Sequence, residues 1–194
     1  DTLDALSQSF GLNYPELISS FETYVDSRVF NDPNNSGLLI EVINRSILTG
    51  DTEGAINYSL TALKSDPLNE KILYTLGATY MELGDFDSAN KYLLKATTVD
   101  NDYFDAWYNL GAMRMNQGVE LNSQANLIPI SNSEEHNRLK DRAMDHFRNC
   151  LVPLEQAYRL DPNNESLSRT LFQVKMQLES YDNSKKPILT KKRM

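Results

Sequence analysis

Cysteine, histidine and long hydrophobic runs are all scarce in this sequence of 194 residues. A single cysteine forms neither an internal disulfide nor a Cys-based zinc site, which excludes a disulfide scaffold and a zinc finger. Apolar stretches such as Gly37 to Ile40 fall far short of the roughly 18 residues that a membrane-spanning helix needs. The eight glycines are scattered singly, so no glycine-rich phosphate loop is present. With 40% hydrophobic residues, the chain is expected to fold as a soluble protein.

Positive charge is also in short supply, because 19 Lys and Arg stand against 27 Asp and Glu for a formal net charge of −8. The last ten positions contain no acid and five of the bases: Lys185, Lys186, Lys191, Lys192 and Arg193. The rest of the chain is therefore more acidic than the total suggests. An acidic surface repels phosphate backbones, so nucleic acid is not expected as a partner. The basic end is interpreted as a solvated tail.

A fixed spacing of 34 residues runs through the sequence. It separates Gly50, Gly84 and Gly118, and also the pairs Ala55 and Ala89, Ala62 and Ala96, Asp66 and Asp100, and Pro33 and Pro67. In the last copy the step grows to 61 residues, from Asp100 to Asp161, so this copy contains 27 extra residues. Such a spacing indicates an array of structural repeats.

Each repeat contains two runs with helical periodicity. In Glu70 to Tyr103 the first run places four residues on one face: Leu73, Leu76, Gly77 and Tyr80. Gly84 then favours the left-handed end of a helix, and Asp85 can cap the next one. The second run consists of Phe86, Ala89, Leu93 and Ala96. Each repeat is therefore predicted to be an antiparallel pair of helices.

These positions resemble the tetratricopeptide repeat, which has a bulky residue at position 4, Leu at 7, small residues at 8, 20 and 27, aromatic residues at 11 and 17, and Pro at 32. Glu70 to Tyr103 fits nearly all of this pattern, with Asn101 in place of the proline. The third copy departs at Arg114, which occupies the aromatic position 11, and the first copy has Ile43 and Ser46 at positions 8 and 11. The resemblance implies an all-α fold, a right-handed superhelical stack of antiparallel helix pairs called an α-solenoid.

The repeats divide the chain into six segments: a degenerate N-terminal helix pair at 1–35, repeats at 36–69, 70–103 and 104–164, a capping helix at 165–181 and a basic flexible tail at 182–194. The extra residues, about 119–145, are interpreted as an extended helical hairpin, because Leu121, Ala125 and Ile128, then Leu139 and Ala143, keep helical spacing. A long disordered loop is the alternative. Pro153 falls inside the second helix of this repeat and is expected to kink it.

The supply of catalytic side chains is poor, since His136 and His146 are the only histidines. His146 and Cys150 lie four residues apart on a predicted helix and could share a metal ion. Cys150, however, occupies the small-residue position 20, which favours a packed core residue. No nucleophile elbow or triad spacing is recognisable. We therefore predict a protein without catalytic activity, metal or cofactor.

In the family that this chain resembles, positions 2, 5, 9 and 12 of each first helix line a concave groove. Carried over to this sequence, the groove residues are Asn44, Ile47, Lys71, Tyr74, Ala78, Met81, Asp105, Tyr108, Ala112, Met115, Arg169 and Gln173, with Ser166 and Met176 as extensions. Tyr and Met at equivalent positions suit the binding of a peptide. Packing of these side chains against one another or a terminal helix is the alternative. The carboxylate clamp of some relatives looks incomplete, because Asp105 and Asn109 replace cations.

These observations predict a non-catalytic scaffold that binds a partner peptide or protein in its concave groove, with a structural self-assembly module as the alternative. The partner's identity is unknown, a homo-oligomer is possible, and the acidic chain favours partners with some positive charge. The compartment is left open between the cytoplasm and, if a signal peptide preceded Asp1, a periplasmic or exported location.

Overall fold

The computed structural model describes residues 35–185 and seven isolated positions before them: Glu16, Ser19, Thr23, Tyr24, Ser27, Arg28 and Asp32. Apart from these positions, the helix pair expected at 1–35 lies outside the described residues, as does the expected tail after Lys185. The chain forms two compact units, residues 1–79 and 80–194, and the boundary falls inside helix α5.

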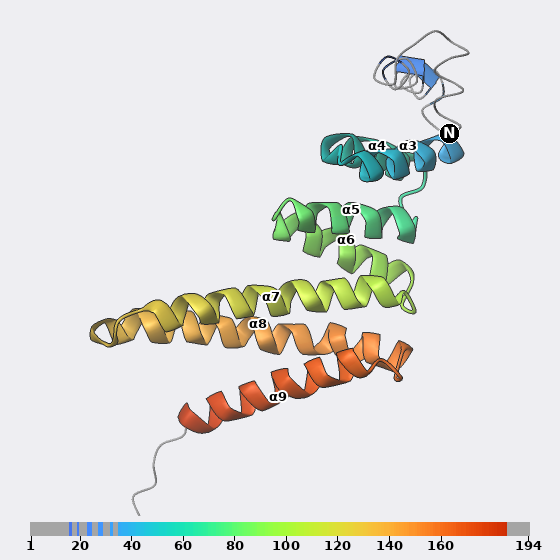
Figure 1. Cartoon of the computed structure of the whole chain (residues 1–194). Helices are drawn as coiled ribbons and strands as arrows, with labels where there is room; N and C mark the ends of the chain where they lie inside the picture. The colour runs from blue at the N-terminus through green and yellow to red at the C-terminus, as the bar shows by residue number, and fades with distance from the viewer. Residues whose placement is uncertain are drawn as a thin grey trace, which may run out of the picture. The chain divides into compact units, whose positions relative to one another are not determined.

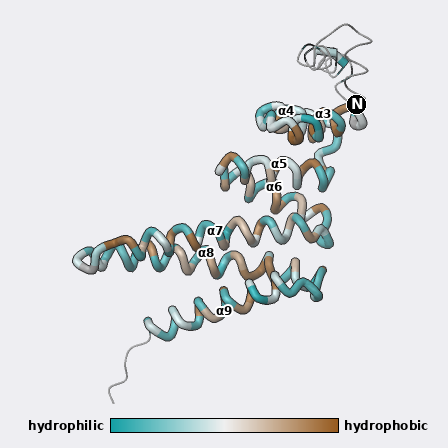
Figure 2. The backbone as a smooth tube through the Cα atoms, in the orientation of Figure 1, coloured by the Kyte–Doolittle hydropathy of each residue, from teal (hydrophilic) through white to brown (hydrophobic). Residues whose placement is uncertain are grey.

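The residues from 35 to 185 are helical throughout, with short connections and no strand (Figure 1). The α-helices are α3 (Ser36–Thr49), α4 (Thr52–Ser65), α5 (Glu70–Glu82), α6 (Phe86–Val99), α7 (Phe104–Leu127), α8 (Ser133–Leu160) and α9 (Glu165–Lys185), and a short 3-10 helix, η1, covers Ile130–Asn132. Figure 2 shows hydrophobic and hydrophilic residues interspersed along these helices, as expected where one face of each is buried. The all-α solenoid class predicted from the sequence is confirmed.

In unit 1, helices α3 and α4 form an antiparallel pair joined by a tight Gly-Asp turn. Gly50 ends α3 at φ 73°, a left-handed conformation that glycine adopts without strain. Asp51 begins α4, because its side chain accepts a 2.9 Å hydrogen bond from the backbone N–H of Gly54. The hydrophobic core of this unit consists of Leu39, Ile43, Ala62 and Ile72, with Tyr58 and Leu63 packed against it.

Unit 2 repeats the same turn between α5 and α6. Gly84 lies at φ 74°, and Asp85 accepts a 3.1 Å hydrogen bond from the N–H of Ser88. Hydrogen bonding to the side chain of Ser88, and then to its backbone N–H, lowers the pKa of the Asp85 carboxyl, because these bonds stabilise the ionised form. Tyr80 at position 11 stacks on Tyr92, with ring centroids 5.7 Å apart. The repeat pattern thus fixes both the end of one helix and the start of the next.

The extra residues of the third repeat belong to a long hairpin made of α7, with 24 residues, and α8, with 28 (Figure 1). Residues 119–145 are helical except at the connection of 128–132, where η1 leads into α8. Gly118 keeps its 34-residue spacing from Gly84 but lies inside α7, where a Cβ would come within 3.1 Å of Phe147 and of the Ala143 carbonyl. The helix therefore passes through the position at which the other repeats turn.

Small residues recur every seven positions along the face of α7 that contacts α8. Gly111, Gly118 and Ala125 are all buried, and a Cβ on Gly111 would lie 2.5 Å from Cδ2 of Leu154. A repeat of seven keeps one face of a helix directed at its partner over several turns. This seam of small residues lets the two helices approach closely along the hairpin.

Helix α8 continues through the buried Pro153, the site of the expected kink. A proline has no N–H to donate to the carbonyl four residues earlier, which here is that of Asn149. The guanidinium of Arg114 takes over, since its Nη1 donates to the Asn149 oxygen at 3.1 Å and its Nη2 to Oδ1 of Asn90 at 2.7 Å. Arg114, the residue that departs from the family pattern, therefore supplies the hydrogen bond that Pro153 cannot donate to the Asn149 carbonyl.

Helix α9 covers the end of the core of unit 2. Asn164 begins it by accepting a 3.0 Å hydrogen bond from the N–H of Leu167. Its buried face consists of Leu167, Leu171, Val174 and Leu178, which join a core cluster with Phe147, Cys150 and Leu154 of α8. The helix extends to Lys185, four residues beyond the limit of 181 expected for the cap.

Candidate functional site

The twelve predicted groove residues lie on α3, α5 and α7, the first helices of their repeats, and on the capping helix α9. All twelve are exposed or half-buried, whereas the residues at the repeat's packing positions, such as Leu76, Ala89 and Leu110, are completely buried. Each first helix therefore has one face in the core and another that carries the predicted residues.

In unit 1, the structure brings two of the predicted residues together. Asn44 of α3 and Lys71 of α5 line one cavity of about 410 Å³, whose apolar part is formed by Ile40, Ile43 and Ile72. Asn69, Glu70 and Thr75 complete the lining. Ile47, less than one turn after Asn44, is 47% exposed. The cavity thus offers an amide and an ammonium group beside aliphatic surface. Tyr74 and Ala78, also in this unit, are half-buried.

In unit 2, the predicted residues are less uniform. Tyr108 is 41% exposed and stacks on Phe104, while Asp105 is exposed on the same helix. Met115 packs against the hydrophobic core, which agrees with the alternative that these side chains contact their neighbours. Met81 and Ala112 are half-buried and Gln173 is exposed. Arg169 forms an ion pair with Glu165 of its own helix at 3.4 Å.

The geometry around His146 and Cys150 does not favour metal binding. The Cys150 thiol is completely buried and donates to the Phe147 carbonyl at 3.1 Å. Burial raises its pKa to about 12, so it stays protonated at neutral pH. Burial, and then the positive charge of Arg142, lower the pKa of His146. Between residues 35 and 185, no group of three His, Cys, Asp or Glu side chains is arranged to hold an ion.

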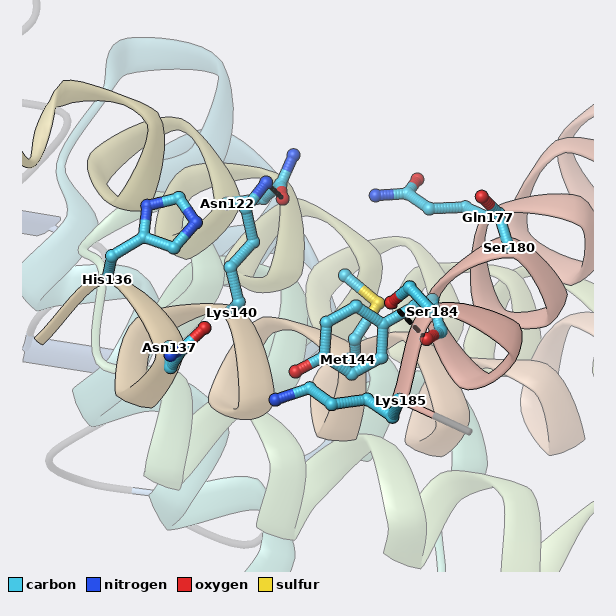
Figure 3. A pocket seen from close by; sticks show the side chains of 10 residues that line it. Asn122, His136, Asn137, Lys140, Met144, Gln177, Ser180, Ser184 and Lys185 are labelled. Atoms are coloured by element: carbon cyan, nitrogen blue, oxygen red, sulfur yellow. Dashed lines mark hydrogen bonds between the residues drawn. The ribbon is translucent and has the colours of Figure 1, made fainter. Parts of the chain in front are cut away.

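Sequence reasoning missed a polar cavity of about 650 Å³ in unit 2, which we call the hairpin notch. One wall consists of His136, Asn137, Lys140 and Met144 of α8 with Asn122 of α7, and the other of Gln177, Ser180, Tyr181, Ser184 and Lys185 of α9 (Figure 3). Every lining residue from the hairpin lies within the 27-residue insertion. This cavity was not predicted, because α9 was expected to end at residue 181 and not at Lys185.

Comparison with protein families gives a match between residues 47–113 and the model of the tetratricopeptide repeat. This stretch contains the turns at Gly50 and Gly84 and the whole of α4, α5 and α6. The chain therefore contains tetratricopeptide repeats. None of the helices in its described part is both long and apolar enough to cross a membrane. A comparison with curated proteins gives no match for this repeat protein.

Several solved structures share the fold of this repeat protein. The first repeat domain of Spaghetti (RPAP3), bound to an HSP90 peptide SRMEEVD, is 19% identical, with a TM-score of 0.56 over 76% of this chain and 96% of that one. The Sgt2 repeat domain from Aspergillus fumigatus is 21% identical, with a TM-score of 0.54 over 78% and 84%. A repeat protein from Bacteroides fragilis is 18% identical, with a TM-score of 0.52 over 90% and 98%. At these sequence identities, the comparison shows a shared fold only.

Proposed function

We propose that this repeat protein is a non-catalytic scaffold that binds a segment of a partner protein on the exposed faces of its first helices. The observation that carries the proposal is the cavity of unit 1, where Asn44 and Lys71 from successive repeats converge at positions used for recognition in this family. Fold alone does not determine function, so the proposal rests on this site rather than on the repeat itself.

The chemistry of the cavity suits an extended peptide. The Asn44 amide can both donate and accept hydrogen bonds, as a peptide backbone requires, and the Lys71 ammonium can donate to a carbonyl or carboxylate. Ile40 and Ile43 supply apolar contact for a side chain of the same peptide. Unit 2 has an exposed aromatic ring of its own, that of Tyr108 on α7.

The RPAP3 domain binds the HSP90 peptide SRMEEVD, whose last four residues include three acids. In this chain, Asp105 and Asn109 occupy positions 2 and 6 of the third repeat, where a clamp for a terminal carboxylate needs cations. The whole chain also has a net charge of −8. We therefore infer that the exposed faces of the first helices prefer a neutral or basic segment of a partner.

Self-assembly is the second candidate, and one observation favours it. Helix α9 exposes Phe172 and Met176 at 66% and 49%, and Val152 of α8 is 69% exposed. Exposed apolar side chains at the last helix of a solenoid can contact another repeat. Sedimentation of the purified chain as a function of concentration tests this candidate, because a dimer through these residues would dissociate when Phe172 is replaced by Asp.

A crosslinking pulldown tests the scaffold proposal. The matched variants are Asn44→Ala with Lys71→Ala, and, as a control, Lys64→Ala at an exposed position of α4. Partners recovered with the wild type should be lost with the double variant and retained with the control, while circular dichroism stays unchanged. Equal recovery with both variants would place the interface elsewhere, and recovery of only the chain itself would favour self-assembly.

A further inference from the structure

The hairpin notch has a positively charged lining in an otherwise acidic chain. Its charged lining residues are Lys140 and Lys185, and the others are amides, hydroxyls, one methionine and His136. No Asp or Glu is among them, although acids outnumber bases by 27 to 19 over the whole sequence. A concave site with one sign of charge attracts ligands of the opposite sign.

The charge of Lys185 is largely matched by a neighbour. Its Nζ forms a 3.2 Å ion pair with Asp141, which also accepts a hydrogen bond from the hydroxyl of Tyr181. These contacts lower the pKa of the Asp141 carboxyl, the Tyr181 hydrogen bond most of all. Asp141 therefore stays ionised and holds Lys185, at the end of α9, against α8.

Lys140 is different, because its ammonium group is held by amides rather than by an acid. It donates to Oδ1 of Asn122 at 2.7 Å and to Oδ1 of Asn126 at 2.8 Å. Among residues 35–185, no carboxylate forms an ion pair with it. Neutral amides orient the group without cancelling its charge, and a lysine has a third N–H to donate. Lys140 is thus a half-buried, oriented cation with spare donor capacity.

We propose that the hairpin notch binds a carboxylate side chain of an acidic peptide segment, with Lys140 as the residue that recognises it. The amides of Asn137 and Gln177 and the hydroxyl of Ser180 line the same cavity and supply further donors, whereas the Ser184 hydroxyl already donates to the Tyr181 carbonyl at 2.6 Å (Figure 3). Met144 offers apolar contact to the methylene groups of a glutamate. This site lies entirely in unit 2 and does not depend on the function proposed for the first helices.

The test is a titration followed by NMR, with an acetylated and amidated hexaglutamate peptide as the probe. Hexaglutamine and inorganic phosphate are the comparisons at equal concentration. Hexaglutamate should shift the backbone amides of 136–144 and 177–185, and hexaglutamine should not. The absence of such shifts, or shifts confined to α3 and α5, would overturn the proposal. Equal shifts from phosphate would also overturn it, by showing a general anion site.

Matched substitutions separate the roles of the charges. Lys140→Gln should weaken hexaglutamate binding by about tenfold, since a charge-assisted hydrogen bond in a half-buried site is worth roughly that factor. Asp141→Asn should strengthen it by roughly threefold, the value of an exposed ion pair, because Lys185 is released. Lys64→Gln removes the same charge elsewhere and should change nothing. If Lys71→Gln abolished binding while Lys140→Gln retained it, the peptide would be in the first-helix cavity and the notch assignment would fail.

Discussion

Arg114 and Pro153 should be energetically coupled, because the arginine donates to the carbonyl that the proline leaves without a helical partner. The perturbation is a double-mutant cycle with Arg114→Met and Pro153→Ala. In the wild-type background, Arg114→Met removes hydrogen bonds to both Asn149 and Asn90. With alanine at 153, the restored backbone N–H can donate to the Asn149 carbonyl. In that background, Arg114→Met leaves only the Asn90 side chain without its hydrogen bond.

The size of the coupling follows from the exposure of the carbonyl. A hydrogen bond from a charged donor contributes about 1.5–3 kcal/mol when it is buried. The Asn149 bond lies at the protein surface, where water can replace part of it, so a coupling free energy of about 1 kcal/mol is expected. Arg148→Met provides the control, since that guanidinium contacts Asp145 and Asp182 instead and should be additive with Pro153→Ala.

Urea unfolding followed by tryptophan fluorescence measures the cycle. Trp107 is the single tryptophan, packs against the core of unit 2 and donates from Nε1 to the Asn101 carbonyl at 2.8 Å, so its signal reports that unit. With a denaturant slope of about 1–3 kcal/mol/M, the coupling shifts midpoints by roughly 0.3–1 M. If Arg114→Met lowers the free energy of unfolding equally in both backgrounds, the reasoning is refuted.

Three further predictions concern the same unit. Gly111→Ala should lower the free energy of unfolding by about 2 kcal/mol, because the added methyl group overlaps Leu154, and a urea titration with unchanged stability would contradict this. For Cys150, the unfolded thiol has a pKa near 9.0 and the folded one about 12, so only the unfolded state deprotonates between these values. Stability should therefore fall as pH rises above 9, and Cys150→Ala should lessen that slope in parallel titrations. Deleting 119–145 should leave a folded protein, since repeats contact mainly their neighbours, with faster hydrogen exchange in the last turns of α9. Loss of cooperative unfolding would show instead that the hairpin is needed by the core.

The repeat spacing carried most of the information about the fold, because it marks where backbones must turn or approach. The Gly-Asp turns at Gly50 and Gly84 could be predicted in this way, since a left-handed residue and a helix cap are local requirements. Gly118 has the same spacing but lies within α7, because the contacts that continue this helix come from α8, far along the sequence. The 34-residue spacing therefore identified Gly118 as a repeat position, but it did not show that this glycine packs against α8 instead of forming a turn.

The candidate sites were harder to predict, because they depend on contacts between distant helices. The side of a helix that carries Asn44 or Lys71 follows from the repeat, but the shared cavity requires the packing of α3 against α5. The last turn of α9 is supported by Tyr181 and Lys185 binding Asp141, which lies about forty residues earlier in the sequence. No local signal near residue 181 indicates such a contact. The hairpin notch was missed for that reason.

The seam of small residues in α7 also sets a rule for changing the length of the hairpin. The residues of the seam, Gly111, Gly118 and Ala125, are seven residues apart, which is close to two full helical turns. All three therefore lie on the face of α7 that contacts α8, where they place a hydrogen atom or a methyl group. Adding or removing seven residues in both helices would preserve this register. Other lengths would bring larger side chains into the space opposite Phe147 and Leu154. Natural variants and engineered hairpins of this type should therefore differ in length by multiples of seven per helix, with a glycine or alanine at each step.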